Sequence, residues 1–139
     1  MVKRQGHEER PDRPKPDRPL DELAKVVVDA GLKVHKALGP GLLESVYEHC
    51  LAHELQARGA PFQRQPASPA ADGPAPAYGY RLDVVVAGAI VVEIVAVDAP
   101  ARLHDPEVLA HLRRSGYRLA LLLDFRAERF HDGVKRFVI

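Results

Sequence analysis

Two acidic residues interrupt a stretch of sequence that is otherwise almost entirely apolar. The segment RLDVVVAGAIVVEIVAV, residues 81–97, carries Asp83 and Glu93 among valines and isoleucines. Its two halves are typical of β-strands, whose side chains alternate between the faces of a sheet. A hairpin turn centred on Gly88 would set Asp83 directly opposite Glu93. Two neighbouring acids on one sheet face repel each other, so we expect either Arg81 or a bound cation to compensate them.

A third acid, Glu44, lies in a segment with helical spacing. At about 100° per residue, Glu44 falls within the apolar arc of its helix rather than opposite it. The residues of that arc are Val46, Tyr47, Cys50, Leu51 and Leu55. A hard divalent ion such as Mg²⁺ is held by a few carboxylates and by water, which Asp83, Glu93 and Glu44 would supply. The alternative is an internal ion-pair network in which Arg81 or Arg64 neutralises the acids.

These acids are placed by elements that the spacing of apolar residues and turn residues predicts. The N-terminal 19 residues are rich in Pro and charge and are predicted to form a disordered tail, followed by one domain over residues 20–139. The expected helices are 23–38, with Asp21 as N-cap, then 42–58, ended by Gly59, and 105–115. The expected strands are 61–66, 80–86, 90–97, 117–125 and 132–139. The order α-α-β-β-β-α-β-β predicts an α/β fold, with a central mixed sheet flanked by helices.

Composition limits the classes of function. The chain has 139 residues, enough for one domain with its own core, and a formal net charge of +1. So small a net charge gives no strong field toward nucleic acid, so any such binding needs a local patch. The single cysteine, Cys50, excludes an internal disulfide. No apolar run has the length of a membrane span, and no signal peptide is recognised, so we expect a cytoplasmic protein that does not enter a membrane.

Several blocks of the sequence resemble one family. LGPGLLESVYEHCLAHELQARG is similar to the signature of the GxxExxY proteins, with Gly41, Glu44 and Tyr47 at the named positions. YRLDVVV, IVVEIVAV and ALLLDF resemble that family's strands, and the likeness spans residues 23–139. GxxExxY proteins are assigned to the PD-(D/E)xK nuclease-like superfamily, so the resemblance implies a restriction-endonuclease-like single domain. It also implies Mg²⁺ or Mn²⁺ as cofactor and phosphodiester cleavage in DNA or RNA, with Asp83, Glu93 and Glu44 as metal ligands and catalytic acids.

The sequence departs from the family at the position of the catalytic lysine. Where the family has E-x-K, this chain has Glu93-Ile94-Val95, and valine can neither orient a water nor stabilise charge on a phosphate. Arg81 is a candidate for the second role, although a guanidinium is no base at neutral pH. Lys36 and His35 are the other groups that could compensate, His35 being more typical of a packed or surface histidine.

Three hypotheses of function follow, of which the last in order is an active nuclease whose catalytic lysine lies elsewhere in the sequence. The first is a nuclease-like protein that binds a divalent metal and nucleic acid, with cleavage weak or lost because of Val95. The second is a catalytically dead relative whose fold serves as a protein-interaction or assembly module. The predicted edge strands PFQRQP and KRFVI permit a homodimer or another protein partner.

Overall fold

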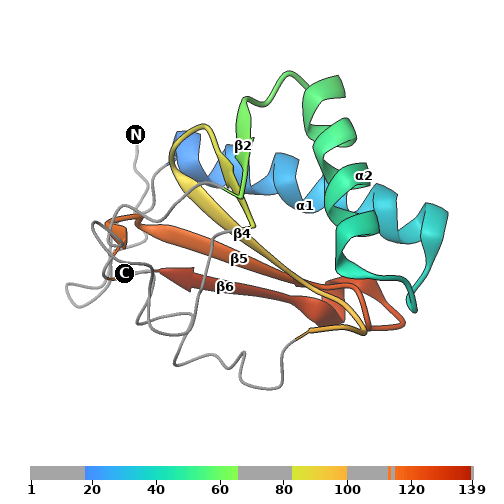
Figure 1. Ribbon diagram of the computed structural model, residues 1–139. Helices are drawn as coiled ribbons and strands as arrows, with labels where there is room; N and C mark the ends of the chain where they lie inside the picture. Colours follow the sequence, from blue (N-terminus) through green and yellow to red (C-terminus); the bar gives the residue numbers. More distant parts are fainter. Residues whose placement is uncertain (1–17, 66–82, 100–112, 114, 139) are drawn as a thin grey trace, which may run out of the picture.

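In the part of the chain that the structure describes, a five-stranded mixed sheet carries the two long helices on one face (Figure 1). The computed structural model describes residues 18–65, 83–99, 113 and 115–138. The helices are α1 (Arg18–Leu38) and α2 (Glu44–Ala57), and a short 3-10 helix, η1, spans Phe130–Gly133. The strands are β2 (Phe62–Arg64), β3 (Val84–Val86), β4 (Ile90–Val95), β5 (Leu119–Asp124) and β6 (Val134–Val138).

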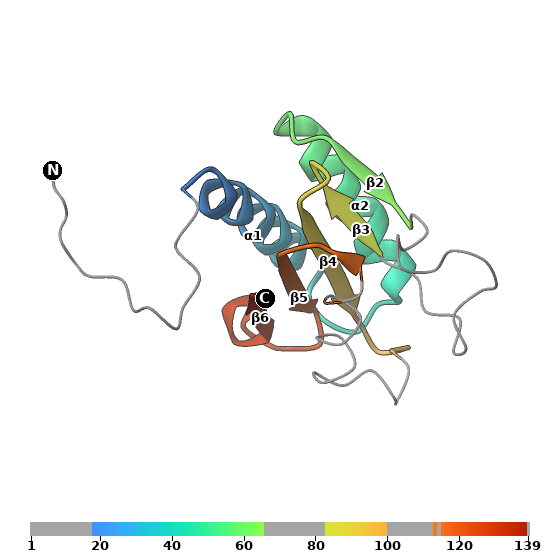
Figure 2. The ribbon, with the colours of Figure 1, turned by 90° about the vertical axis from the view of Figure 1, so that its left-hand side faces the viewer.

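The strands follow one another across the sheet in the order β2-β3-β4-β5-β6, so β2 and β6 form opposite edges (Figure 2). Among the described strands, β4 and β5 run parallel, and the pairs β2–β3, β3–β4 and β5–β6 are antiparallel. A parallel pair needs a crossover connection, whereas an antiparallel pair can be joined by a tight turn. The α/β class and the mixed sheet expected from the sequence are therefore confirmed.

The hairpin between β3 and β4 has the predicted register. Val84 pairs with Val92 and Val86 with Ile90, and Asp83 directly precedes the paired residues of β3. The turn places Ala87 and Gly88 at φ values of 54° and 63°, and the N–H of Ala89 donates to the carbonyl oxygen of Val86 at 2.9 Å. Two successive positive φ values are typical of a type I′ turn, whose twist matches that of the strands.

The main core lies between the helices and one face of the sheet. It contains the side chains at alternate positions of β3, β4 and β5 that face the helices, namely Val84, Val86, Ile90, Val92, Ile94, Leu119, Leu121 and Leu123. Helix α1 contributes small residues, and at Gly31 it lies so close to η1 that an added Cβ would stand 2.5 Å from Cζ of Phe130. Residues 85, 91, 93, 95, 120 and 122 belong to the opposite face by strand alternation.

Several predicted boundaries require correction. Helix α1 begins at Arg18, so Arg18 and Pro19 are helical rather than part of a tail, and Asp21 lies in the first turn, where it ion-pairs with Arg136 instead of capping the helix. The last strand begins at Val134, because the preceding residues form η1. Of the helix expected over 105–115, Arg113 and Ser115 are helical, and the rest lies outside the described residues, as do residues 1–17 of the predicted tail.

The buried face of α2 is rotated relative to the predicted arc. Its buried residues are Tyr47, Glu48, Leu51, Ala52 and Leu55. Val46, expected inside the arc, is 38% exposed, and Cys50, also expected to be buried, is only partly so. The reason is that α2 packs against both β2 and α1, so the side that faces the edge of the sheet is covered and the side near Val46 is not.

Candidate functional site

Glu44 is the first residue of α2, and a residue distant in sequence fixes its position. Its backbone N–H donates a hydrogen bond to Oδ1 of Asp98 at 2.9 Å. Asp98 lies in the turn that follows β4. Leu43, at the N-cap position, makes no side-chain cap, so Asp98 satisfies one of the N–H groups that a helix start leaves open. The helix acid is thereby held near the end of the strand that carries Glu93.

Tyr47 secures the corner that precedes Glu44. Its hydroxyl donates to the carbonyl oxygen of Gly39 at 2.6 Å and accepts from the N–H of Leu42 at 3.1 Å. Its ring is fully buried and stacks on Phe125, with centroids 4.3 Å apart. Tyr47, which the sequence places within the apolar arc, is thus packed with its hydroxyl group hydrogen-bonded, and it shapes the turn from which α2 starts.

Asp83 lies at the point where β3 meets β4. Its Oδ2 accepts a hydrogen bond from the backbone N–H of Ile94 at 2.7 Å. The side chain of Glu93 also acts on this carboxyl group and lowers the pKa of Asp83, against the larger effect of burial.

Glu93 is buried, at 3% exposure, in the middle of β4. It interacts with Asp83, whereas its Oε2 atom is buried and accepts no hydrogen bond from the described part of the chain. The predicted facing of Asp83 and Glu93 is thus present in the structure.

A fourth acid, Glu48, was not predicted from the sequence. It lies one helical turn after Glu44 and is 2% exposed. Its Oε2 accepts a hydrogen bond from Nε of Arg64 at 3.0 Å, and Nε2 of Gln65 donates to Oε1 at 3.2 Å. Arg64, which the sequence offered as a cation for the predicted acids, is therefore ion-paired with Glu48. The position of Glu48, at about 140° from Leu43 on the helical wheel, lay just outside the predicted arc.

We refer to Glu44, Glu48, Asp83, Glu93 and Asp98 as the carboxylate cluster. Burial, together with the charges of Asp83, Asp98 and Glu48, raises the pKa of Glu44 from 4.5 to about 7. Burial also raises the pKa of Asp83 from 3.8 to about 6; the Ile94 N–H and the hydrogen bond from Glu93 oppose this shift, while the charge of Glu48 adds to it. The cluster therefore concentrates negative charge at a partly buried place, which costs free energy unless protons or cations are taken up.

The remaining predicted groups contribute differently. Arg81 lies outside the described residues. Val95 is buried beside Leu122 and Phe137, in apolar surroundings. His35 is buried: its Nε2 lies 2.7 Å from the carbonyl oxygen of Ala127, and its ring contacts Phe125 and Phe130. It is a packed histidine, and the neighbouring Lys36 is exposed.

The donor set of the cluster suits a hard cation. All its side-chain donors are carboxylate oxygens, the ligands that Mg²⁺ and Mn²⁺ prefer. No three His, Cys, Asp or Glu side chains of the described residues are arranged to hold a metal ion as they stand. Mg²⁺ nevertheless needs only one or two carboxylates when water and substrate phosphate complete its shell, and the adjacent Asp83 and Glu93 provide two.

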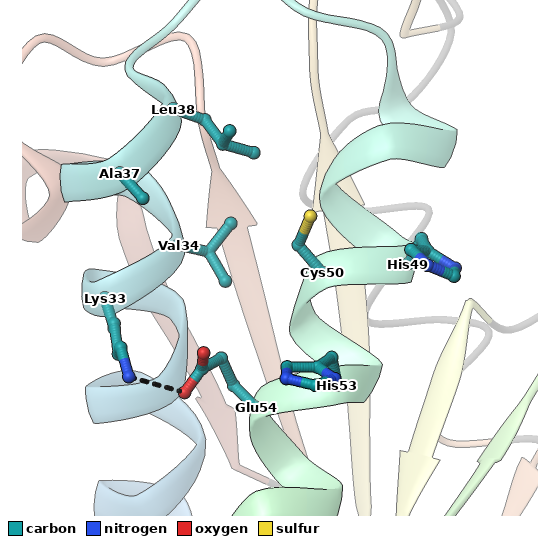
Figure 3. Close-up of a pocket in the computed structure, with 8 residues that line it drawn as sticks. All are labelled: Lys33, Val34, Ala37, Leu38, His49, Cys50, His53 and Glu54. Carbon is teal, nitrogen blue, oxygen red and sulfur yellow. Dashed lines mark ion pairs between the residues drawn. The ribbon is translucent and has the colours of Figure 1, made fainter.

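A groove of about 340 Å³ runs between α1 and α2, away from the cluster (Figure 3). Cys50 points into the groove, and Glu54 forms an ion pair with Lys33 at 3.6 Å across it. Glu54 also pairs with Arg58. His49 and His53, four residues apart on α2, are exposed. The groove is therefore lined by residues of α1 and α2, and none of its lining residues is an acid of the carboxylate cluster.

Among the helices that the structure describes, none has the length and apolar character needed to cross a membrane.

Comparison with known proteins identifies the family. Searches among curated proteins and among solved structures give no match. The model of the PD-(D/E)XK nuclease superfamily matches residues 21–137, a range that includes every acid of the cluster and all of the described helices and strands except the first three residues of α1 and the last residue of β6. The chain belongs to the PD-(D/E)XK nuclease superfamily.

Proposed function

We propose that this protein is a nuclease-like member of its superfamily that binds Mg²⁺ or Mn²⁺ through Asp83 and Glu93, with Glu44 as a third acid at the same site. It binds DNA or RNA there, with phosphodiester cleavage weak or lost. The observation that carries the proposal is that these acids are buried close together: burial first, and then repulsion by neighbouring carboxylates, raises the pKa of Glu44 to about 7 and that of Asp83 to about 6. A divalent cation would relieve that repulsion.

Each acid has a distinct part in this proposal. Asp83 is held by the N–H of Ile94 through Oδ2 and would supply a carboxylate oxygen to the ion. Glu93 lies on the neighbouring strand, and Glu44, half-buried at the start of α2, would take up a proton from a water at the site. When bound, the ion would neutralise charge on a phosphate oxygen and lower the pKa of a bound water. Arg81 is proposed to stabilise the charge of the same phosphate.

The weakness of cleavage follows from Val95. The position that carries a lysine in the GxxExxY resemblance holds an apolar side chain with 5% exposure. Among the residues that lower the pKa of Glu44 or Asp83, no lysine or arginine of the described chain is found. Without a positioned cation, the attacking water is not oriented and the transition state loses electrostatic stabilisation.

Thermal unfolding in EDTA, Mg²⁺ and Mn²⁺ tests the metal site, because a ligand that binds only the folded state raises its stability. We expect the ions to raise the Tm of the wild type and not that of Glu93→Gln or Asp83→Asn. Glu128→Gln, which removes an exposed acid, is the matched control and should keep the wild-type response. Equal Tm values in EDTA and in saturating Mg²⁺ and Mn²⁺ for the wild type would contradict the proposal.

A second function, as an interaction module, is favoured by a different observation. Four apolar side chains are exposed around the corner that joins α1 to α2: Leu38, Leu42, Leu43 and Val46. Leu43, at 53% exposure, is the most exposed of them. Such grouped apolar side chains are typical of protein contacts. If this corner is the working surface, Leu43→Ser should abolish self-association or partner binding in analytical ultracentrifugation while leaving the response to Mg²⁺ unchanged.

A further inference from the structure

Arg64 lies at the edge of the carboxylate cluster and is held by only one of its nitrogens. It is the last residue of β2 and pairs with Val84, the residue after Asp83. Its Nε donates to Oε2 of Glu48 at 3.0 Å. The Arg64 side chain is 43% exposed, whereas that of Glu48 is 2% exposed. Within the described part of the chain, Nη1 and Nη2 of Arg64 make no hydrogen bond or ion pair.

The anchor that fixes Arg64 is more rigid than a surface ion pair. Glu48 is buried and must be compensated, because a buried carboxylate left unpaired is strongly destabilising. Gln65 supports the same carboxylate through its side-chain amide, and its backbone N–H donates to the carbonyl oxygen of Asp83 at 2.6 Å. Gln65 adopts a φ of 50°, which is uncommon for a residue with a side chain. Glu48, Arg64, Gln65 and Asp83 are thus tied together in one arrangement.

This arrangement holds a cation, the guanidinium of Arg64, beside Glu48 of the carboxylate cluster. A phosphate that approaches Asp83 or Glu44 meets several carboxylates, and the net charge of +1 supplies no attraction at long range. A guanidinium has five N–H donors in a fixed fork that matches the oxygens of a phosphate. Because Nε is taken by Glu48, the outer edge of the fork, formed by Nη1 and Nη2, stays available for a second anion.

We propose that Arg64 binds a non-bridging phosphate oxygen of the nucleic-acid backbone, next to the phosphodiester held at Asp83 and Glu93. Glu48 serves as a positioning residue that orients the guanidinium. This inference rests on the proposed function, since it assigns a contact of the same site. The ligand chemistry is a phosphodiester of a polynucleotide strand, not a free nucleotide, because the contact lies beside the metal ligands rather than among them.

Binding of a short fluorescein-labelled DNA oligonucleotide, single-stranded or duplex, in Ca²⁺ tests this contact by fluorescence anisotropy. We expect Arg64→Gln to raise the Kd about tenfold, as loss of a charged hydrogen-bonded contact does. The slope of log Kd against log salt concentration should fall by about 0.7–0.9, the value for one lost phosphate contact. Arg58→Gln removes another ion-paired arginine of the same domain and should change neither quantity.

Arg64→Lys separates binding from folding. A lysine ammonium is a single point charge that remains on Glu48, so the buried carboxylate stays compensated and the Tm should stay close to that of the wild type. Its affinity for the oligonucleotide should nevertheless fall nearly as far as that of Arg64→Gln. Wild-type affinity and salt dependence in both Arg64 variants would overturn the inference.

The failure of this inference can be distinguished from failure of the proposed function. If the wild type is stabilised by Mg²⁺ and binds the oligonucleotide, but the Arg64 variants bind equally well, only the role of Arg64 is wrong. If the wild type responds to Mg²⁺ and does not bind the oligonucleotide, the role of Arg64 and the nucleic-acid part of the proposed function are both wrong. If it neither binds the oligonucleotide nor responds to the ion, the whole proposed function fails with it.

Discussion

The backbone N–H of Glu44 and Oδ1 of Asp98 are joined by a hydrogen bond of 2.9 Å that ties the start of α2 to the turn after β4. These two residues are 54 positions apart in the sequence, yet their contact brings the helix acid to the strand that carries Glu93. The same contact adds a negative charge beside Glu44 and contributes to its raised pKa. One residue therefore both positions a candidate metal ligand and alters its protonation.

Substitution of Asp98 separates these two effects. Asp98→Ala removes the cap and should lower the free energy of unfolding by about 1 kcal/mol, the usual cost of losing a helix cap. Asp98→Asn keeps an acceptor for the Glu44 N–H and removes the charge, so it should cost less stability and lower the pKa of Glu44. Urea unfolding measures the first effect, and NMR titration of the Glu44 carboxyl measures the second. If the two variants lose equal stability, the cap does not operate through the acceptor oxygen.

Stability should fall as pH rises through the titration of the cluster. The pKa of Glu44 is raised from 4.5 to about 7 and that of Asp83 from 3.8 to about 6. Between the unfolded and folded values the folded state binds more protons than the unfolded state, so the free energy of unfolding decreases with increasing pH. Their contribution is fully present below about pH 4 and is lost by about pH 7.

The difference between the wild type and Glu44→Gln isolates this contribution from other titrating groups. Urea unfolding at a series of pH values in EDTA should show that the wild type loses stability relative to Glu44→Gln as pH rises from about 4.5 to about 7. Added Mg²⁺ should reduce that loss, because the ion favours the ionised carboxylates. A pH-independent difference between the two proteins would mean that Glu44 titrates normally.

The close approach of α1 and η1 makes Gly31 a sensitive position. A Cβ at this residue would stand 2.5 Å from Cζ of Phe130 and 3.3 Å from Cδ1 of Leu123. Although alanine favours a helix, we expect Gly31→Ala to destabilise the fold by about 1–3 kcal/mol through overpacking. In a double-mutant cycle, Phe130→Leu should recover part of that loss. Greater stability of Gly31→Ala in urea unfolding would show that the contact is not tight.

The β3–β4 turn offers a stabilising substitution. Ala87 has a φ of 54°, a left-handed conformation that costs a residue with a Cβ about 1 kcal/mol. Ala87→Asn creates the Asn-Gly pair that type I′ turns favour and should raise the free energy of unfolding by about 0.5–1 kcal/mol. Ala89→Gly, at the next alanine of the turn, is the control and should not stabilise. Thermal and urea unfolding measure the stability of both variants. A stability of Ala87→Asn no higher than that of the wild type would contradict the prediction.

The sheet and the pair of acids at its centre were predictable because they depend on local rules. Alternation in the two valine-rich strands and the Gly88 turn determine the register, and this places Asp83 opposite Glu93 without knowledge of the rest of the fold. The spacing of α2 likewise placed Glu44 on the inner side of its helix. Tyr47 was predictable for the same reason, since it lies well within the apolar arc.

Glu48 and Asp98 were not predictable because their roles depend on contacts between distant elements. Glu48 lies just outside the apolar arc, and only its pairing with Arg64 at the sheet edge allows its burial. Asp98 follows a strand with no signal that its side chain reaches a helix start. The exposure of Val46 has the same origin, because the rotation of α2 is set by its packing against both β2 and α1.

The central claim is that Asp83 and Glu93 hold a divalent ion, and electron paramagnetic resonance of Mn²⁺ tests it most directly. Binding to the protein removes the sharp signal of free Mn²⁺ in solution. We predict that the wild type and Glu128→Gln deplete that signal and that Mg²⁺ restores it by competition, whereas Asp83→Asn and Glu93→Gln leave it unchanged. Full retention of the free Mn²⁺ signal by the wild type, or equal depletion by all four proteins, would contradict the account.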